Sequence, residues 1–413
     1  MLKTGSLIIS AIILGIAGTW IATQRTAISK LEKETTGLEK RIAASQSLSD
    51  PASTASRASA DGKESPPSFT FDWPKFATQV EQWRRGIGDF RERTEFGECI
   101  AAMSSAEILG KLEEISALDL PVEKREMLAT QFLDTLGKKD PEKALDWFWE
   151  RKSPRFDNLY LLANVLGGWS KNDPAKACAW LDGKAANGEF ETKSLDGVCK
   201  ARVTFEEQLA RQLYGTQPEL IKSRLQAMYA EEARRVAHNL AYTESAQKDP
   251  AALANLLRES LTPHHSNEIL ANLASQNSNN LPEAAKFINA AQATPSERNA
   301  CAEQILRENI SELASNGTIK IEDLDTLRKW AGNVGADVDA TTATALGYSV
   351  CSGRINFDEV SEIVLHYCET SGSQKLLLDF LASNARFSVR EARELAGKVA
   401  DPQQRQMILD KIR

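Results

Sequence analysis

Apolar residues recur through most of the chain at spacings of three and four, the pattern of a helix with one buried face. Three fragments, beginning at Asp140, Asp173 and Asp249, share one form: a polar residue, a proline, and apolar residues three and six positions after the proline. No segment shows the strict alternation of apolar and polar residues that is typical of a strand. The pattern therefore predicts an all-α protein.

The same form recurs along the chain at regular intervals. Taking the residue after the polar position as an anchor, nine units begin at Ala106, Pro141, Pro174, Pro218, Pro250, Pro282, Leu324, Phe357 and Val389. The steps between anchors are 35, 33, 44, 32, 32, 42, 33 and 32 residues. Six steps are nearly constant and two are longer, so the chain is one repeat array.

Each anchor has the local sequence of a helix start. The preceding residue is Ser, Asp or Asn in seven of the nine units: Ser105, Asp140, Asp173, Asp249, Asp323, Asn356 and Ser388. Such a side chain accepts hydrogen bonds from the first free amides of a helix, and proline suits the first helical position. Gln217 and Leu281 break this rule, although each precedes a Pro-Glu pair.

The predicted buried face follows each anchor in register. Three residues after it stand Leu109, Ala144, Ala177, Ile221, Leu253, Ala285, Leu327, Val360 and Ala392, all apolar. Six residues after it stand Leu112, Trp147, Trp180, Arg224, Leu256, Ile288, Trp330, Ile363 and Leu395, with the arginine as the exception. Because these positions share a helical stripe, we expect them to form the core.

A second helical run completes each unit before the next anchor, as at 122–136, 159–169, 231–247, 267–275, 298–313 and 374–383. The expected fold is a right-handed α-solenoid of about nine to ten helical-hairpin repeats with a period of 32–35, covering residues 69–413. A diverged capping repeat at 69–100 would begin at Asp72-Trp73-Pro74. The two long steps predict extended loops around 183–197 and 316–321.

The N-terminal segment, residues 1–25, has the pattern of a membrane anchor. Residues 4–24 carry no charge, and 21 helical residues span roughly the 30 Å of a bilayer's hydrocarbon. A cleaved signal peptide is the alternative. The positive-inside rule would place the large domain in the cytoplasm, because most nearby basic residues follow the span, whereas we favour an inner-membrane anchor with a periplasmic repeat domain.

Two short segments join this anchor to the repeats. Residues 26–48 predict a coiled-coil-like helix, and its apolar seam at 28–42 is a candidate homodimer contact. Residues 49–68 are rich in Ser, Ala and Pro and predict a flexible linker.

The charge distribution excludes one class of partner. The chain has a net charge of −7, with +3 in residues 1–48 and therefore −10 in the remainder. An acidic array does not favour binding to phosphate backbones, so we expect no nucleic acid partner. The basic cluster Arg84, Arg85, Arg91 and Arg93 fits either a solvated helix face or anionic headgroups.

The repeats resemble a known class. Their length is similar to that of tetratricopeptide repeats, and the Pro-x-x-Ala-x-x-Trp helix resembles that of uncharacterised exported bacterial helical-repeat proteins. The resemblance covers roughly residues 100–413, but the paired Leu-Gly and Tyr positions of the tetratricopeptide consensus are missing. It implies a superhelical interaction surface and supplies no functional residues.

Motifs for catalysis are missing from the sequence. There is no phosphate-binding Gly-Lys-Ser/Thr loop, His-Glu-x-x-His, Cys-x-x-Cys or Gly-x-Ser-x-Gly, so we expect no catalytic residue, no cofactor and no enzyme. His264, His265 and Glu268 are the one metal-like group. Adjacent helical residues point about 100° apart, so a polar helix start after Thr262-Pro263 explains them better.

Two tryptophans and two cysteine pairs are further candidates. Trp149 and Trp169 lie off the predicted core stripe and could line a concave groove, where they would stack on a peptide or a sugar, or could simply pack between helices. Cys178 with Cys199, and Cys351 with Cys368, could form disulfides in an exported domain; free thiols are the alternative.

Together these features predict a membrane-anchored helical-repeat scaffold for protein–protein interaction in the bacterial cell envelope, holding a protein or peptide in its groove. The alternative is a module that binds cell-wall polysaccharide through Trp149 and Trp169. An enzyme is the least supported interpretation.

Overall fold

The structure is a computed structural model of the 413-residue chain, and it describes residues 71–151, 159–192, 194–317, 319–384 and 389–412. The predicted anchor (1–25), helix (26–48) and linker (49–68) lie outside these ranges. Asp72–Arg413 forms one compact unit with its own hydrophobic core. Across the ranges just given, no helix combines the length and apolar character needed to cross a bilayer.

The described residues form twenty-one helices and no strand. The "first helices" are those at the predicted anchors: α4 (Ser105–Ala117), α6 (Pro141–Glu150), α8 (Pro174–Ala186), α10 (Pro218–Gln226), α13 (Pro250–Ser260), α15 (Leu281–Ala290), α17 (Ile321–Asn333), α19 (Phe357–Ser371) and α21 (Val389–Ala396). The all-α prediction is therefore confirmed for this part of the chain.

A "second helix" follows each first helix: α5 (Val122–Lys139), α7 (Leu159–Asn172), α9 (Lys200–Leu213), α11 (Ala230–Ala241), α14 (Pro263–Ser275), α16 (Pro295–Ser315), α18 (Val338–Cys351), α20 (Lys375–Asn384) and α22 (Pro402–Lys411). Three helices stand outside this scheme: α2 (Trp73–Arg84), α3 (Phe90–Ala102) and the single turn α12 (Glu244–Gln247).

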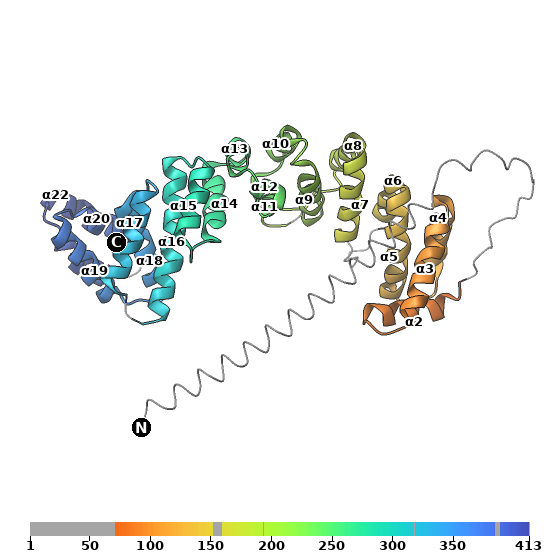
Figure 1. Cartoon of the computed structure of the whole chain (residues 1–413), viewed down its shortest axis with the longest axis horizontal. Coiled ribbons are helices and arrows are strands. Elements are labelled where there is room, and N and C mark those ends of the chain that lie inside the picture. The colour runs from red at the N-terminus through yellow and green to blue at the C-terminus, as the bar shows by residue number, and fades with distance from the viewer. Residues whose placement is uncertain (1–70, 152–158, 193, 318, 385–388, 413) are drawn as a thin grey trace, which may run out of the picture. The chain divides into compact units, whose positions relative to one another are not determined.

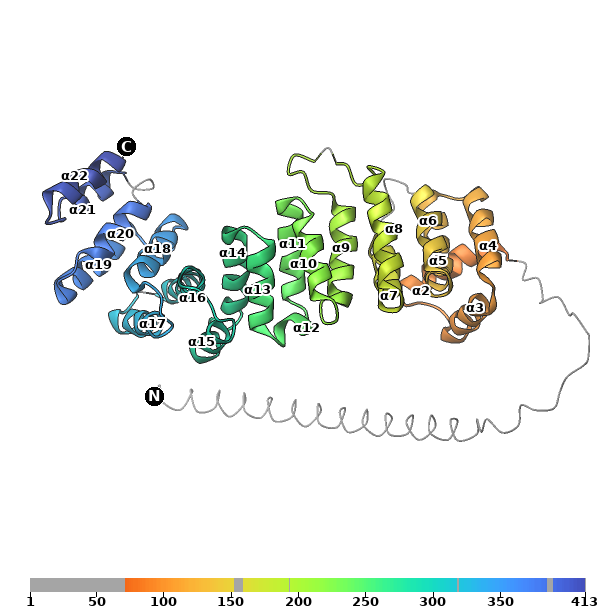
Figure 2. The ribbon, with the colours of Figure 1, turned by 90° about the horizontal axis from the view of Figure 1, so that it is seen from above.

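The helices pack in chain order (Figures 1 and 2). Each second helix contacts the next, so that α5, α7, α9, α11, α14, α16, α18, α20 and α22 form an unbroken row. First helices pack on the neighbouring second helices, and some also contact one another, as α10 contacts α13 and α13 contacts α15. The architecture is that of sequentially packed helices, consistent with a helical repeat.

The predicted helix starts hold at most anchors. The side chains of Asp140, Asp173, Asp249 and Asn356 each accept a hydrogen bond from the backbone N–H three residues on. Proline at the first helical position follows the three aspartates, as expected from its fixed φ.

Three predicted starts are wrong by a few residues. Ser104 caps α4 in place of Ser105, forming a capping box with Glu107. Asn280 caps α15, so Leu281 is the first helical residue and no exception to the capping rule. Helix α17 begins at Ile321, which places Asp323 inside its first turn.

The core stripe follows the same correction. All the apolar residues six positions after an anchor are buried. Three positions after it, only Leu109 and Ala285 are not fully buried, because the helices that contain them start one residue early. Their preceding neighbours Ile108 and Ala284 are completely buried instead.

The two long steps have different causes. A loop of residues 187–199 joins α8 to α9, as predicted for the first. For the second, the predicted extended loop is wrong: α16 has 21 residues, and the connection after it, from Asn316 to Lys320, is short. The extra length of this repeat is therefore mainly helix.

The N-terminal hairpin has the expected start. The Asp72 side chain accepts from Lys75 N at 3.2 Å, and Ala77 and Val80 on the same helix are buried. Helices α2 and α3 both pack on α5. They therefore cover the first end of the row of second helices.

Candidate functional site

A three-residue bridge links the first helices of consecutive hairpins. Trp147 Nε1 on α6 donates to Glu113 Oε1 on α4 at 3.0 Å. Arg151, four residues after the tryptophan, forms an ion pair with the same carboxylate at 2.7 Å and lies 5.1 Å from the indole centroid. One acid thus holds both the indole and a cation that stacks on it.

The next pair of hairpins has the same bridge. Trp180 Nε1 on α8 donates to Asp146 Oδ1 on α6 at 2.9 Å. Lys184 forms an ion pair with Asp146 at 3.0 Å and lies 5.4 Å from the Trp180 ring. Residues four apart share a helix face, which brings each cation over the indole that precedes it.

Arg224 occupies the equivalent position on α10, where the sequence pattern shows an exception. Its guanidinium binds Glu206 on α9 through two bonds of 2.8 Å and pairs with Asp182 on α8 at 2.9 Å. Burial opposes its charge, but the bonds to Glu206 and Asp182 outweigh burial and raise the pKa of Arg224. An ion pair therefore replaces the indole between α8 and α10.

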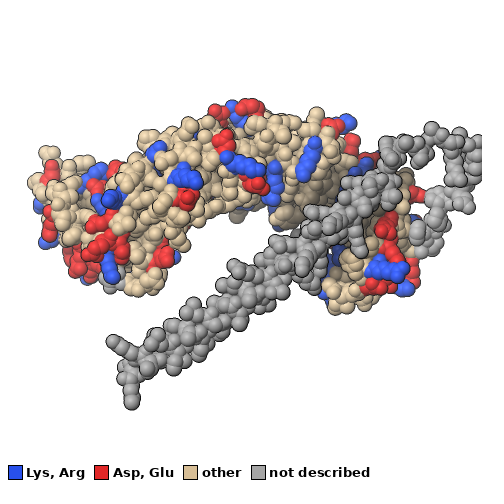
Figure 3. All heavy atoms as spheres, in the orientation of Figure 1, with Lys and Arg blue, Asp and Glu red and all other residues tan. Residues whose placement is uncertain are grey.

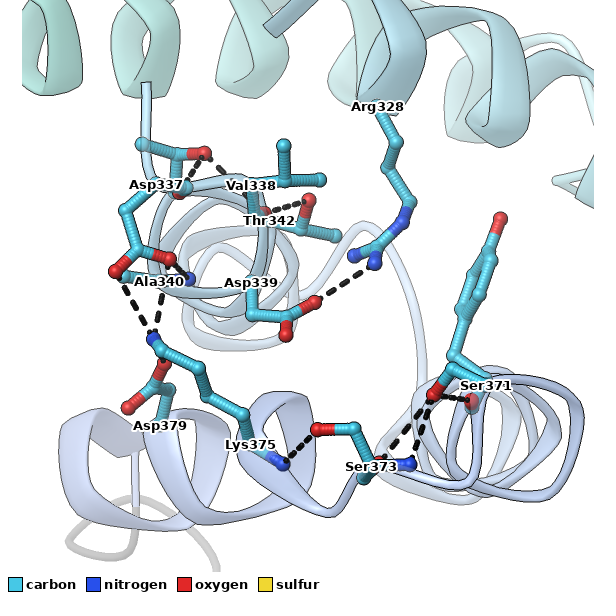
Figure 4. Close-up of polar contacts among 12 residues, drawn as sticks. Arg328, Asp337, Val338, Asp339, Ala340, Thr342, Ser371, Ser373, Lys375 and Asp379 are labelled. Atoms are coloured by element: carbon cyan, nitrogen blue, oxygen red, sulfur yellow. Dashed lines mark hydrogen bonds and ion pairs between the residues drawn. The ribbon is translucent and has the colours of Figure 1, made fainter. Parts of the chain in front are cut away.

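The C-terminal hairpins carry a tyrosine version of the bridge. Tyr367 Oη on α19 donates to Asp325 Oδ1 on α17 at 2.7 Å, and Arg328 Cζ lies 4.3 Å from the Tyr367 ring. Figure 4 shows Arg328 reaching Asp339 on α18, a contact of 2.7 Å. Burial and the bond to Asp325 raise the pKa of the Tyr367 hydroxyl.

The same region joins α18 to α20 through a lysine. Lys375 Nζ lies between Asp337, at 3.0 Å, and Asp379, at 2.6 Å (Figure 4). Burial opposes the charge of Lys375, yet the bonds to both carboxylates raise its pKa. This contact ties the start of one second helix to the start of the next.

A pocket of about 360 Å³ opens between α4, α5 and α6, and we call it the α4–α6 pocket. Its apolar walls are Ile115, Val122, Ala129, Trp147 and Phe148, and its polar groups are Ser116, Arg125, Glu126 and Arg151. Trp147 and Arg151 of the first bridge thus line the pocket. An apolar hollow with charged groups at its edge suits a side chain from a peptide or protein.

A second depression, of about 620 Å³, lies between α5 and α7, and we call it the Trp169 pocket. Its apolar lining is Trp169 with Pro141, Leu161 and Val165, and its polar side chains include Asp134, Lys138, Asn164 and Asn172. Trp169 itself is only 9% exposed. An aromatic surface beside amides and carboxylates is the chemistry of a sugar site, which is the alternative role predicted for Trp169.

Trp149 lies in an aromatic cluster at the end of α6. Its ring packs at 5.9 Å from Trp180, 5.3 Å from Phe190 and 5.9 Å from Phe205. Phe190 belongs to the long loop between α8 and α9. Trp149 is 7% exposed, and its three aromatic neighbours pack against its ring; its partner-binding role stays a prediction.

The histidine candidates lie at a helix start, as the alternative interpretation predicted. Thr262 caps α14 by accepting from His265 N at 3.4 Å. The carboxylate of Glu268 pairs with Arg234 at 3.2 Å. Within the ranges that the structure covers, no group of three or more His, Cys, Asp or Glu is placed to hold a metal ion.

All six cysteines fall in the described residues, and all six are free thiols. The disulfide candidates Cys178 with Cys199 and Cys351 with Cys368 are therefore unpaired in this structure. Burial raises the pKa of the Cys301 thiol to about 12, consistent with a packing role for this residue.

Sequence reasoning missed the acids of the bridges. Glu113 and Asp146 each stand 34 residues before the tryptophan that they bind. The sequence does contain a signal for them: each acid stands one repeat length before its tryptophan, and a basic residue follows that tryptophan by four positions.

Comparison of the chain with protein-family models, with curated proteins and with solved structures finds no match. The fold defines the class: an all-helical protein whose helices pack in sequence, consistent with a helical repeat.

Proposed function

We propose that the chain is a membrane-anchored helical-repeat scaffold that binds a protein partner in the bacterial cell envelope. Its repeats form a right-handed α-solenoid, anchored through residues 4–24 in the inner membrane with the repeats in the periplasm. Residues 28–42 would pair two copies. The proposal involves no catalytic residue, cofactor or nucleic acid.

The α4–α6 pocket is the observation that carries this proposal. Its walls come from two consecutive hairpins, which the bridge of Glu113, Trp147 and Arg151 joins. Val122 at the pocket is 37% exposed, so apolar surface is available to a partner. We expect an apolar side chain of the partner to enter the pocket, with its polar flanks near Arg125 and Arg151.

Photo-crosslinking in native membranes tests this assignment. A photoreactive amino acid at Val122 of the full chain should give one defined protein adduct, whereas the same amino acid at Met407 on α22, which is 61% exposed, should not. Filling the pocket with Ala129→Phe should remove the adduct. Equal labelling from both positions, or none from Val122, would contradict the proposal.

The Trp169 pocket supports a second candidate, a module that binds cell-wall polysaccharide. Asn164 and Asn172 supply amide donors and acceptors beside the indole. Glycan binding should then quench tryptophan fluorescence in the wild type and not in Trp169→Phe. An unchanged signal across a titration with cell-wall fragments would remove this candidate.

Orientation needs its own measurement. A C-terminal reporter that is active only in the periplasm should be active on the full chain. Activity of a cytoplasmic reporter instead would support the opposite orientation, which the basic residues after the span favour.

A further inference from the structure

The connection between α2 and α3 is residues 85–89, and we call it, together with the helix ends that flank it (residues 84 and 90–93), the α2–α3 turn. Gly86 N donates to Trp83 O at 3.1 Å and Ile87 N to Gln82 O at 2.9 Å, the two bonds of a Schellman motif. Gly86 adopts the positive φ of 72° that this motif requires. Asp89 then caps α3 by accepting from Arg91 N at 2.8 Å.

Two large apolar side chains of this turn are exposed. Ile87 is 61% exposed and Phe90 is 79% exposed. In a Schellman motif the residue at the position of Ile87 usually packs on an apolar residue at the position of Gln82. Because glutamine stands there, Ile87 has no such apolar partner within its own motif.

Four arginines stand close to these two residues in the sequence, in a chain whose net charge is negative. Residues 84–93 contain Arg84, Arg85, Arg91 and Arg93 against Asp89 and Glu92, a local charge of +2. Arg85 pairs with Glu81 at 2.6 Å and Arg91 with Glu95 at 2.8 Å. Arg84 and Arg93 form no ion pair with any residue that the structure describes. On the face seen in Figure 3, basic and acidic side chains are interspersed.

We propose that the α2–α3 turn docks on the surface of an anionic lipid bilayer. Ile87 and Phe90 would enter the headgroup region while the arginines bind lipid phosphates, the arrangement by which amphipathic segments lie on membranes. This inference draws on the proposed anchor for proximity: 46 residues separate Gln24 from Phe71, a length that leaves the turn within reach of the bilayer. The docking itself depends only on residues of the described unit.

Vesicle flotation of the 69–413 fragment tests the docking without the anchor. This fragment retains the compact unit and its core. It should float with vesicles of equimolar phosphatidylglycerol and phosphatidylcholine and not with phosphatidylcholine alone, and high salt should weaken binding. Each arginine near an anionic surface contributes about fivefold to binding, so Arg84→Gln with Arg93→Gln should weaken it by about twenty-fivefold.

The apolar side chains have their own variant and control. Ile87→Ser with Phe90→Ser should lower vesicle binding at least tenfold, because the free energy of burying two such apolar side chains is lost. Leu195→Ser with Met407→Ser removes two apolar side chains elsewhere, each at least as exposed as Ile87, and should leave binding unchanged. No flotation, equal flotation with neutral vesicles, or equal loss in both double variants would overturn the proposal.

Crosslinking of the full chain identifies the occupant in the cell. A photoreactive amino acid at position 90 should label phospholipid in native membranes. A protein adduct, including a second copy of the chain, would overturn the lipid assignment. Failure of the docking leaves the adduct expected at Val122 intact, so the two proposals fail separately.

Discussion

Trp180 Nε1 donates a hydrogen bond to Asp146 Oδ1 across 2.9 Å, joining the first helix of one hairpin to that of the hairpin before. Trp180 is 9% exposed, whereas 42% of the Asp146 side chain is exposed. The bond therefore forms where the buried stripe of α8 meets solvent. Such a bond contributes direction as well as energy, because the indole N–H can face only one acceptor.

A double-mutant cycle should detect this bond as a coupling. Trp180→Phe keeps an aromatic ring and removes the donor, and Asp146→Ala removes the acceptor. We expect the two substitutions to interact by about 0.5–1.5 kcal/mol in the free energy of unfolding. Chemical denaturation of the four proteins measures this, and additive effects would show that the contact contributes nothing.

Arg224→Ala should destabilise the chain far more than loss of a surface ion pair. It leaves the carboxylate of Glu206, which is 5% exposed, without its bidentate partner, at a cost of about 3–5 kcal/mol. Arg390→Ala is the control: that side chain is 82% exposed, and its pair with Glu391 should contribute about 0–1 kcal/mol. If the two variants unfold alike, Glu206 is not held by Arg224.

Gly137→Ala should destabilise although alanine is the better helix former. An added Cβ would lie 2.4 Å from Val165 Cγ2 on α7, a clash that costs about 1–3 kcal/mol. Gly110→Ala on α4 meets no atom within 4 Å and should gain about 0.5–1 kcal/mol. Val165→Ala should relieve part of the cost of the first substitution, and its failure to do so would exclude the clash.

Glu231 on α11 should make folding sensitive to acid. Its hydrogen bonds to Arg234 and then to Arg235 lower the pKa of Glu231 to about 2, from an ordinary 4.5. The folded state therefore binds this proton more weakly than the unfolded state. The resulting stability is complete above pH 4.5 and is lost as the pH falls towards 2.

Urea unfolding of the wild type and Glu231→Gln at several pH values isolates this residue from the other carboxylates. The wild type should be the more stable protein near neutral pH, and its advantage should shrink steadily below pH 4.5. An advantage that is equal at all pH values would mean that Glu231 has no lowered pKa.

Thiol titration checks the cysteines. Cys351 is exposed and should react with a thiol reagent in the native protein, whereas Cys301 is 1% exposed and should react only on unfolding. The denatured, unreduced protein should release six thiols. A count of four would reveal a disulfide.

The local signals in the sequence were sufficient for the helices and their core. Asp140, Asp173 and Asp249 cap helices because capping depends on residues two or three positions away. Two predicted caps are wrong by one residue. Ser104 and Ser105 are adjacent and either could cap α4, and Asn280 stands directly before Leu281, so the sequence allows two neighbouring starts in each case.

The pattern of apolar and polar positions does not predict which side chains of different hairpins contact one another. The sequence marked Arg224 as an exception, but its partners Glu206 and Asp182 stand on two other helices. The spacing of 42 residues predicts a loop where the structure has a long helix, because a longer helix and a longer loop increase the length of a repeat equally. Trp149 lies off the stripe of its own helix, and the neighbouring α8–α9 loop buries it through Phe190.

The unbroken row of second helices gives the array two mechanically different sides. On the second-helix side, helices pack as closely as Gly137 packs on Val165, so they cannot approach further. Separating these helices would expose apolar side chains. On the first-helix side, neighbouring helices are joined by polar bridges whose partners exchange with water at small net cost. Tension along the array would therefore separate the first helices before the second helices, and the distance between consecutive first helices would increase with the force.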